Sequence, residues 1–224
     1  MKNFTMLAAL SALSAMMLIS ANALAEESNV KDHDAMVERM GVGYLGASNI
    51  QHGEGSLRVP VVGVRYWMDE MMGLDVGLGF HISSGGTKTK YEGADEKSVD
   101  EPSEFGFILH GGLPLSFSSG KHHSFQIIPE LNFGYGSSKE DKEKNTGMRL
   151  DIGARAGAEI HFGFIGIPEL SLQGSVGLLF ELTNAKHDND GNPVIKYSHM
   201  SLKTTVNDNP WNIFTSNITA LYYF

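Results

Sequence analysis

The chain has 224 residues, no cysteine and a formal net charge of −9. Without cysteine there is no disulfide framework and no cysteine-ligated metal site. The acidic balance argues against a nucleic-acid partner, which a basic surface would bind.

The N-terminal residues predict export. Lys2 is followed by the apolar run 6–19 and by Ala23-Leu24-Ala25, a small-x-small cleavage pattern. We expect 1–25 to be a signal peptide rather than a retained membrane anchor, because the apolar run is short. Residues 26–40 are charged and have helical propensity, so we expect a periplasmic N-terminal tail or a short helix beneath or inside the following domain.

The remaining apolar residues occur in glycine-rich segments of roughly ten, which is typical of a transmembrane β-barrel. Between 149 and 162, the charged Asp151, Arg155 and Glu159 share the face opposite the apolar one. Such charges would disrupt a soluble sandwich core but suit a polar lumen. We expect an all-β fold, an eight-stranded antiparallel up-and-down transmembrane β-barrel over 41–224. Its segments lie near 41–48, 58–67, 72–82, 104–117, 124–136, 148–162, 169–183 and 212–224.

The connections between these segments alternate in length. Short links at 68–71, 118–123 and 163–168 predict periplasmic turns. Longer, more polar links predict extracellular loops, because an even-stranded barrel with both ends in the periplasm has this parity. These loops are 49–57, 83–103, 137–147 and 184–211. Residues 193–203 also look strand-like after the turn signal Asp190-Gly191; we expect a hairpin above the membrane, and a ten-stranded barrel is the alternative.

The last strand is apolar on one face. Phe214, Ile218, Ala220, Tyr222 and Phe224 fall on that face. The strand resembles the terminal strand of bacterial outer-membrane β-barrels, which typically ends in Phe after apolar residues at alternate positions. The resemblance implies that the barrel assembly machinery reads Tyr222 and Phe224. As a whole, the chain resembles the OmpX and OmpA-transmembrane-domain type, which implies the Gram-negative outer membrane, with its lipid and lipopolysaccharide as partners.

The interior of an eight-stranded barrel is just wide enough to be filled by side chains. Alternation along the strands directs a set of polar residues inward. Among them, Arg65 lies nearly opposite Asp75 across a short turn, so we predict an ion pair between them. Arg155 is a second internal cation, available to Glu130, Asp151 or Glu159. We interpret the set as a polar plug, with a narrow ion channel as the alternative. Its other members are His81, Glu104, His110, His161 and Glu181.

One short motif raises the possibility of an enzyme. His81-Ile82-Ser83 resembles the His-x-Ser element of PagL-type lipid A deacylases, with Glu92 or Glu104 as a third member. However, Ser84 replaces the usual Asn, and alternation turns His81 and Ser83 into the lumen, away from lipid. A PagP-type palmitoyltransferase is supported less, because the apolar face of 26–40 is thin. We therefore expect no enzyme, no cofactor and no metal site, and a structural, envelope or surface-interaction role with a possible ligand at the loops.

Overall fold

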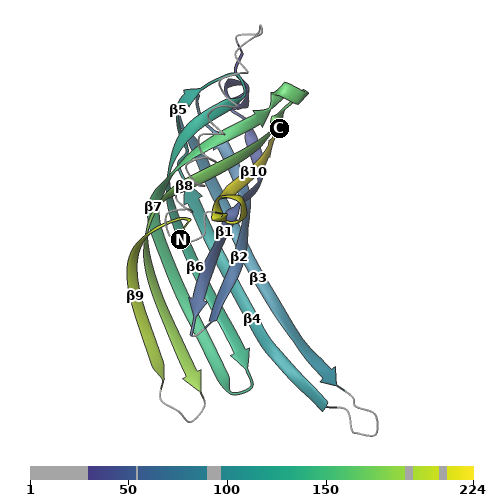
Figure 1. Cartoon of the computed structure of the whole chain (residues 1–224), viewed down its shortest axis with the longest axis vertical. Helices are drawn as coiled ribbons and strands as arrows, with labels where there is room; N and C mark the ends of the chain where they lie inside the picture. The colour runs from purple at the N-terminus through teal and green to yellow at the C-terminus, as the bar shows by residue number, and fades with distance from the viewer. Residues whose placement is uncertain (1–29, 54, 90–96, 190–193, 207–210) are drawn as a thin grey trace, which may run out of the picture. The chain divides into compact units, whose positions relative to one another are not determined.

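A computed structural model of the chain consists mainly of antiparallel strands that follow one another around a sheet (Figure 1). It describes residues 30–53, 55–89, 97–189, 194–206 and 211–224, so the expected signal peptide lies outside the described residues. Residues Lys31–Phe224 form one unit. The strands are β1 (Met40–His52), β2 (Gly55–Trp67), β3 (Gly73–Thr89), β4 (Lys97–Gly112), β5 (Leu115–Ser119), β6 (His123–Glu140), β7 (Glu143–Phe162), β8 (Ile167–Asn189), β9 (Ile195–Thr204) and β10 (Ile218–Tyr223). Three short helical segments accompany them: η1 (Asp34–Met36), η2 (Gly163–Ile165) and α2 (Asn212–Thr215).

The hydrogen-bonded strands close into a ring. Neighbours follow the order β10-β1-β2-β3-β4-β6-β7-β8-β9, and β10 also pairs with β8. Strand β5 continues β4 along β6, while β9 and β10 pair with successive parts of β8. The ten strands therefore occupy eight positions around the ring. The expected all-β, antiparallel, up-and-down sheet is confirmed. Its count is eight if β4–β5 and β9–β10 are each taken as one interrupted strand, and ten if they are counted separately.

The strands extend beyond the segments expected from the sequence. Residues 49–57, expected as a loop, are mostly paired between β1 and β2. Strand pairing likewise covers much of 83–103, 137–147 and 184–189, whereas 90–96, 190–193 and 207–210 lie outside the described residues. The expected strand 212–224 begins as α2, and only its second half is strand. Long strands were underestimated because polar, glycine-rich residues near their tips resemble loop composition.

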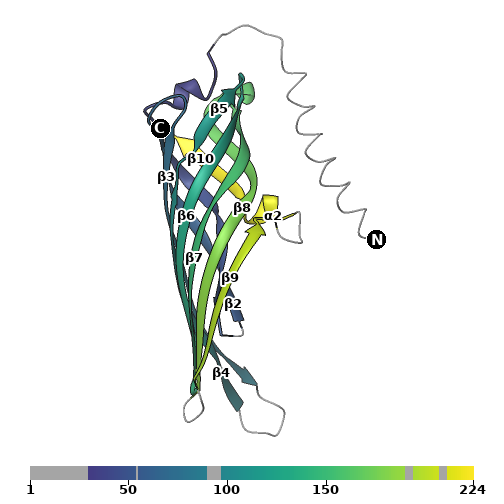
Figure 2. The same ribbon diagram turned by 90° about the vertical axis from the view of Figure 1, so that its left-hand side faces the viewer.

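The two ends of the ring differ, and we name them for that difference. At the turn end, at the top of Figure 1, lie the short turns after β2, β5 and β7, together with Phe224. The opposite end is the hairpin end. The strand pairs β1–β2, β3–β4, β6–β7 and β8–β9 extend toward it, as Figure 2 shows in a second view. No helix among the described residues is long and apolar enough to cross a membrane.

The outward face of the sheet is apolar. On β3, the residues Leu74, Val76, Leu78, Phe80 and Ile82 are 42–73% exposed, whereas Asp75 between them is 1% exposed. Neighbouring strands continue the apolar row through Leu131, Ile152 and Phe180, which lie side by side in register. The charge therefore points inward, the reverse of an ordinary water-soluble domain.

The interior is polar toward the turn end and apolar toward the hairpin end. Leu45 and Ile50 from β1 pack with residues of β2 and with Ile108 of β4 in a buried cluster. Beyond Gly46, whose φ of +116° breaks the register with β2, β1 lies against β6 and β7 across the interior. Gly134 and Gly136 on β6 make room for Ile50 there. The expectation of a lumen filled mainly by polar residues thus holds for only part of its length.

Candidate functional site

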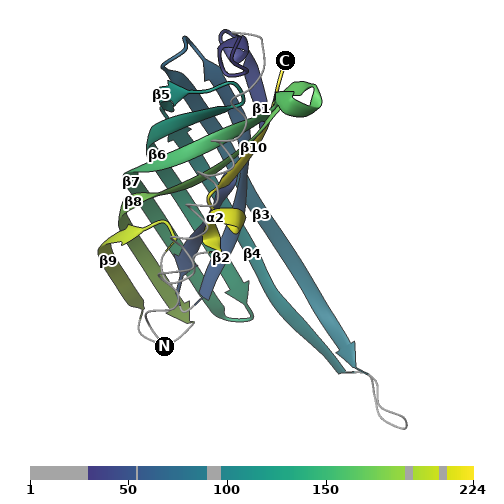
Figure 3. The same cartoon turned by 45° about the horizontal axis from the view of Figure 1, so that its top comes forward.

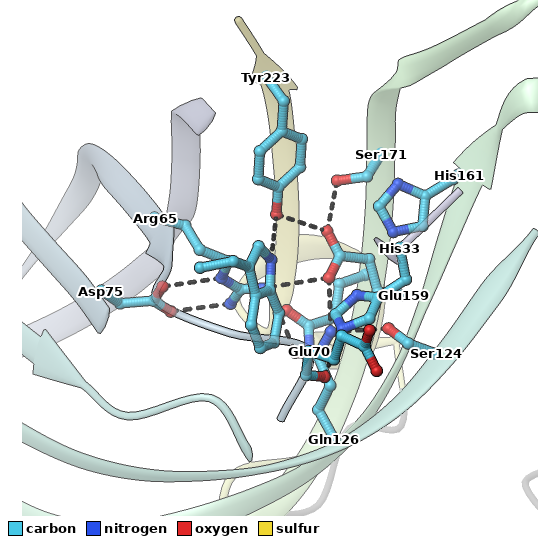
Figure 4. A network of polar contacts seen from close by, with 12 residues as sticks. His33, Arg65, Glu70, Asp75, Ser124, Gln126, Glu159, His161, Ser171 and Tyr223 are labelled. Atoms are coloured by element: carbon cyan, nitrogen blue, oxygen red, sulfur yellow. Dashed lines mark hydrogen bonds and ion pairs between the residues drawn. The ribbon is translucent and has the colours of Figure 1, made fainter. Parts of the chain in front are cut away.

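The most buried charges of the protein meet at the turn end. Arg65 makes a two-pronged contact with Asp75, with Nε–Oδ1 and Nη2–Oδ2 distances of 2.7 Å (Figure 4). This is the ion pair that the sequence predicts, and the register sets it because Arg65 and Asp75 are direct partners in β2 and β3. Arg65 also lies 3.1 Å from Glu159 of β7, on the other side of the interior. One guanidinium is therefore the shared partner of two fully buried carboxylates.

Glu159 is held by neutral donors as well. Ser171 donates to its Oε1 at 2.6 Å, Tyr223 donates to the same oxygen at 3.0 Å, and Gln126 donates to Oε2 at 2.5 Å. Trp67 in turn donates from Nε1 to the Tyr223 hydroxyl at 3.1 Å. Since a buried carboxylate needs several partners, these neutral donors satisfy the hydrogen-bond acceptors of Glu159 that Arg65 leaves open. The sequence reading missed the neutral partners, although Gln126 and Ser171 share the inward parity of their strands.

The N-terminal segment 31–38 closes the turn end. His33 is fully buried, with its ring 4.4 Å from Trp67 in an edge-on arrangement and its Nε2 3.0 Å from the carbonyl oxygen of Glu70. Met36 is also buried, and Asp32 lies 2.7 Å from His122. Within the segment expected as a tail or a short helix, the helical part is the single 3₁₀ turn η1, and 26–29 lie outside the described residues.

Burial lowers the pKa of His33 below its ordinary 6.5. Groups facing it are the carboxylates of Glu159 and Asp34, which oppose the shift, and His161, which adds to it. Neutral His33 stabilises the packed segment above pH 6.5. This stability is lost as the pH falls through the lowered pKa of the folded state, because protonation then favours the exposed histidine.

We therefore expect the segment to loosen at acidic pH. In a Trp211→Phe background, Trp67 fluorescence should change with a midpoint below pH 6.5, because His33 packs on that ring. The His33→Phe variant keeps the ring contact without a titrating group and should lack this transition. An unchanged transition in that variant would assign the pH response to other groups, such as His122.

Two further polar contacts span the middle of the interior. Arg155 lies 2.7 Å from Glu130 and donates to Ser175 at 3.0 Å. His110 lies 2.6 Å from Asn132 on the neighbouring strand. Of the three partners expected for Arg155, the structure therefore selects Glu130. All of these side chains except Asn132 are buried.

A second charged cluster lies in the wall near β8 and β9. Arg149 contacts Asp151 at 2.8 Å and Glu181 at 2.9 Å, and Lys203 contacts Glu181 at 2.5 Å. Asp151 and Glu181 were expected to point inward; Arg149 and Lys203 were not identified. Arg149 has the same parity as Asp151, so alternation alone could have placed it. Lys203 lies on β9, which pairs with β8 rather than forming a separate projection.

The three residues of the deacylase-like motif come close but do not form a relay. Glu104 lies 3.8 Å from His81 Nε2 and 3.4 Å from the Ser83 hydroxyl oxygen, which donates to it. In a catalytic triad the histidine lies between the hydroxyl and the carboxylate. Here the Ser83 hydroxyl donates its hydrogen bond to the Glu104 carboxylate instead. Glu92 lies outside the described residues.

His161 is also buried, 3.3 Å from the carbonyl oxygen of Pro168 and close to the rings of His33 and Tyr223. Tyr222 and Phe224, expected as the assembly signal, are exposed on the outward face. The backbone of Phe224 donates to Met40, which fastens the last residue to the first strand. Among the described residues, no group of three His, Asp or Glu side chains is arranged to hold a metal ion.

Comparison with known proteins provides no identity for the chain. No protein family, curated protein or solved structure matches it. Its function must therefore be argued from the ring of strands, the buried charges and the outward face.

Proposed function

We propose that this protein is a small outer-membrane β-barrel with a structural or surface-interaction role, exported through its N-terminal signal peptide. The observation that supports this most is the inverted arrangement of a closed antiparallel ring. Large apolar side chains are exposed around it, while Arg65, Asp75 and Glu159 are buried inside. In water this arrangement exposes apolar surface and buries charge; in lipid the outward face is in its preferred environment.

The interior supports a plug rather than a channel or an active site. Arg65 and Arg155 each tie together opposite or neighbouring walls, and the β1–β2 hairpin fills the other half with apolar groups. Outer-membrane lipid, lipopolysaccharide and the barrel assembly machinery are the proposed partners. Any extracellular ligand would meet the hairpin end, where the β6–β7 tip carries Lys142 and Glu143.

Refolding of the mature chain into lipid vesicles tests the proposal. We expect a folded band that migrates differently before and after boiling, and trypsin cleavage limited to exposed lysines of the hairpin tips such as Lys142. The barrel fragment should survive because its strands lie in lipid. A folded protein that stays in the aqueous fraction and shows no shift on boiling would contradict the membrane assignment.

A further inference from the structure

The ring of strands is incomplete on one side. Strand β10 pairs with β1 only over Gly41–Tyr44, and beyond the bulge at Gly46 strand β1 turns inward. In the described part of the chain, β9 pairs with β8 alone. The part of β1 beyond Gly46 is therefore not joined to β9. Figure 3 shows α2 beside β10, at the interruption between β9 and β10.

A polar crevice of about 240 Å³ occupies this opening. That volume equals roughly eight water molecules at ~30 Å³ each, which suits a compact polar group rather than a hydrocarbon chain. Its walls come from β1, β7, β8 and β9 and include Asn49, Arg149, Glu181 and Lys203. The second charged cluster described above therefore forms one side of the crevice.

Lys203 is the most exposed charged side chain of this cluster. The Lys203 side chain is 28% exposed, compared with 10% for Glu181 and 1% for Asp151. The ammonium group of Lys203 has three N–H donors, and the contact with Glu181 uses one of them. Lys203 can therefore offer donors and positive charge to an anion in the crevice.

The surface just outside the crevice is apolar. On the outward face of β8 and β9, Leu178 is 55% exposed, and Phe180 and Leu202 are cross-strand partners that are 37% and 71% exposed. Trp211 and Phe214 beside α2 are 69% and 46% exposed, with ring centroids 6.0 Å apart. A ligand bound in the crevice would contact charged side chains on the inner side and apolar side chains on the outer side.

The six residues of β10 separate the opening from the turn end. At ~3.3 Å per residue and a tilt of about 40° this distance is roughly 15 Å along the ring. In an apolar band of about 25 Å, an opening at this height faces hydrocarbon, where unpaired strand edges are tolerated only beside polar groups or water.

We propose that this crevice binds the phosphate group of a phosphorylated lipid, with Lys203 as its main contact and the lipid chains along the outward faces of β8, β9 and α2. This inference rests on the proposed membrane location. The ligand class follows from the partly exposed Lys203 ammonium group, the compact volume and the apolar exterior together.

Native mass spectrometry of the refolded protein in detergent tests the lipid class. The probes are phosphatidic acid, diacylglycerol with the same chains, and inorganic phosphate. We expect phosphatidic acid to bind at least tenfold more tightly than diacylglycerol, and inorganic phosphate not to displace it at equal concentration. Equal binding of the two lipids would overturn the proposal, and displacement by inorganic phosphate would overturn the lipid as the source of the phosphate.

Three variants test the residues. Lys203→Gln should weaken phosphatidic acid binding about tenfold, whereas Lys196→Gln on the same strand, outside the crevice, should leave it unchanged. Glu181→Gln should strengthen binding several-fold, because it releases Lys203 from its internal partner. The gel shift on boiling reports whether each variant is folded. Unchanged binding in folded Lys203→Gln overturns this inference alone, whereas failure of the wild type to enter vesicles contradicts the proposed function.

Discussion

Replacement of Arg65 by methionine should destabilise the folded protein by about 3–5 kcal/mol, the cost of leaving buried charges without their partner. Arg65 holds both Asp75 and Glu159, and all three side chains are at most 1% exposed. Methionine fills much of the same volume, so loss of packing contributes little. Urea unfolding in detergent or vesicles, followed by the gel shift or by tryptophan fluorescence, measures the free energy of unfolding.

Two controls separate the charge effect from a general effect of substitution. Arg39→Met changes the same residue type at an exposed position just before β1, and should cost less than about 0.5 kcal/mol. The triple variant Arg65→Met, Asp75→Asn, Glu159→Gln removes the charges together and should recover much of the lost stability. If the triple variant is no more stable than Arg65→Met, the unpaired carboxylates are not the cause.

The parts of the fold that the sequence predicted depend on local patterns. Alternation along β3 and β7 identified which side chains point inward, because the period of two is a backbone property. A short turn between β2 and β3 then fixed the register, and this was enough to pair Arg65 with Asp75. The contact of Arg65 with Glu159 joins strands far apart in the sequence. No local pattern specifies how a barrel brings opposite walls together.

The parts that were not predicted depend on interruptions and bends. Strand β2 is apolar on both faces near Val61 and Val62, so alternation did not reveal that Leu57, Val59 and Val61 fill the interior. The path of β9 depends on the interruption between β9 and β10. On β8, the residues paired with the two strands are separated only by 175–177. Composition alone favours a projecting hairpin there. Because Lys203 reaches Glu181 only through this pairing, the crevice could not be foreseen from the sequence.

Replacement of Leu131 by arginine should show whether the outward face of the sheet contacts lipid or water. Leu131 is 50% exposed near the middle of β6, next to Ile152 on the outward face. If lipid surrounds the barrel, arginine at this depth should reduce the free energy of unfolding in vesicles by about 2–4 kcal/mol. If water surrounds it, the same exposed substitution should change stability by less than about 0.5 kcal/mol.

Glu140→Arg is the matched control, because it places the same residue at the exposed hairpin end of the same strand. Its expected cost is about 0–1 kcal/mol in vesicles, since charge near the membrane surface stays hydrated. Both variants are compared with the wild type by urea unfolding in vesicles. Equal stability of the two variants would contradict the proposed membrane boundary, whereas a cost confined to Leu131→Arg locates the apolar band on the sheet. That position also fixes whether the crevice beside β9 opens into lipid, and so decides if a phosphorylated lipid can reach Lys203.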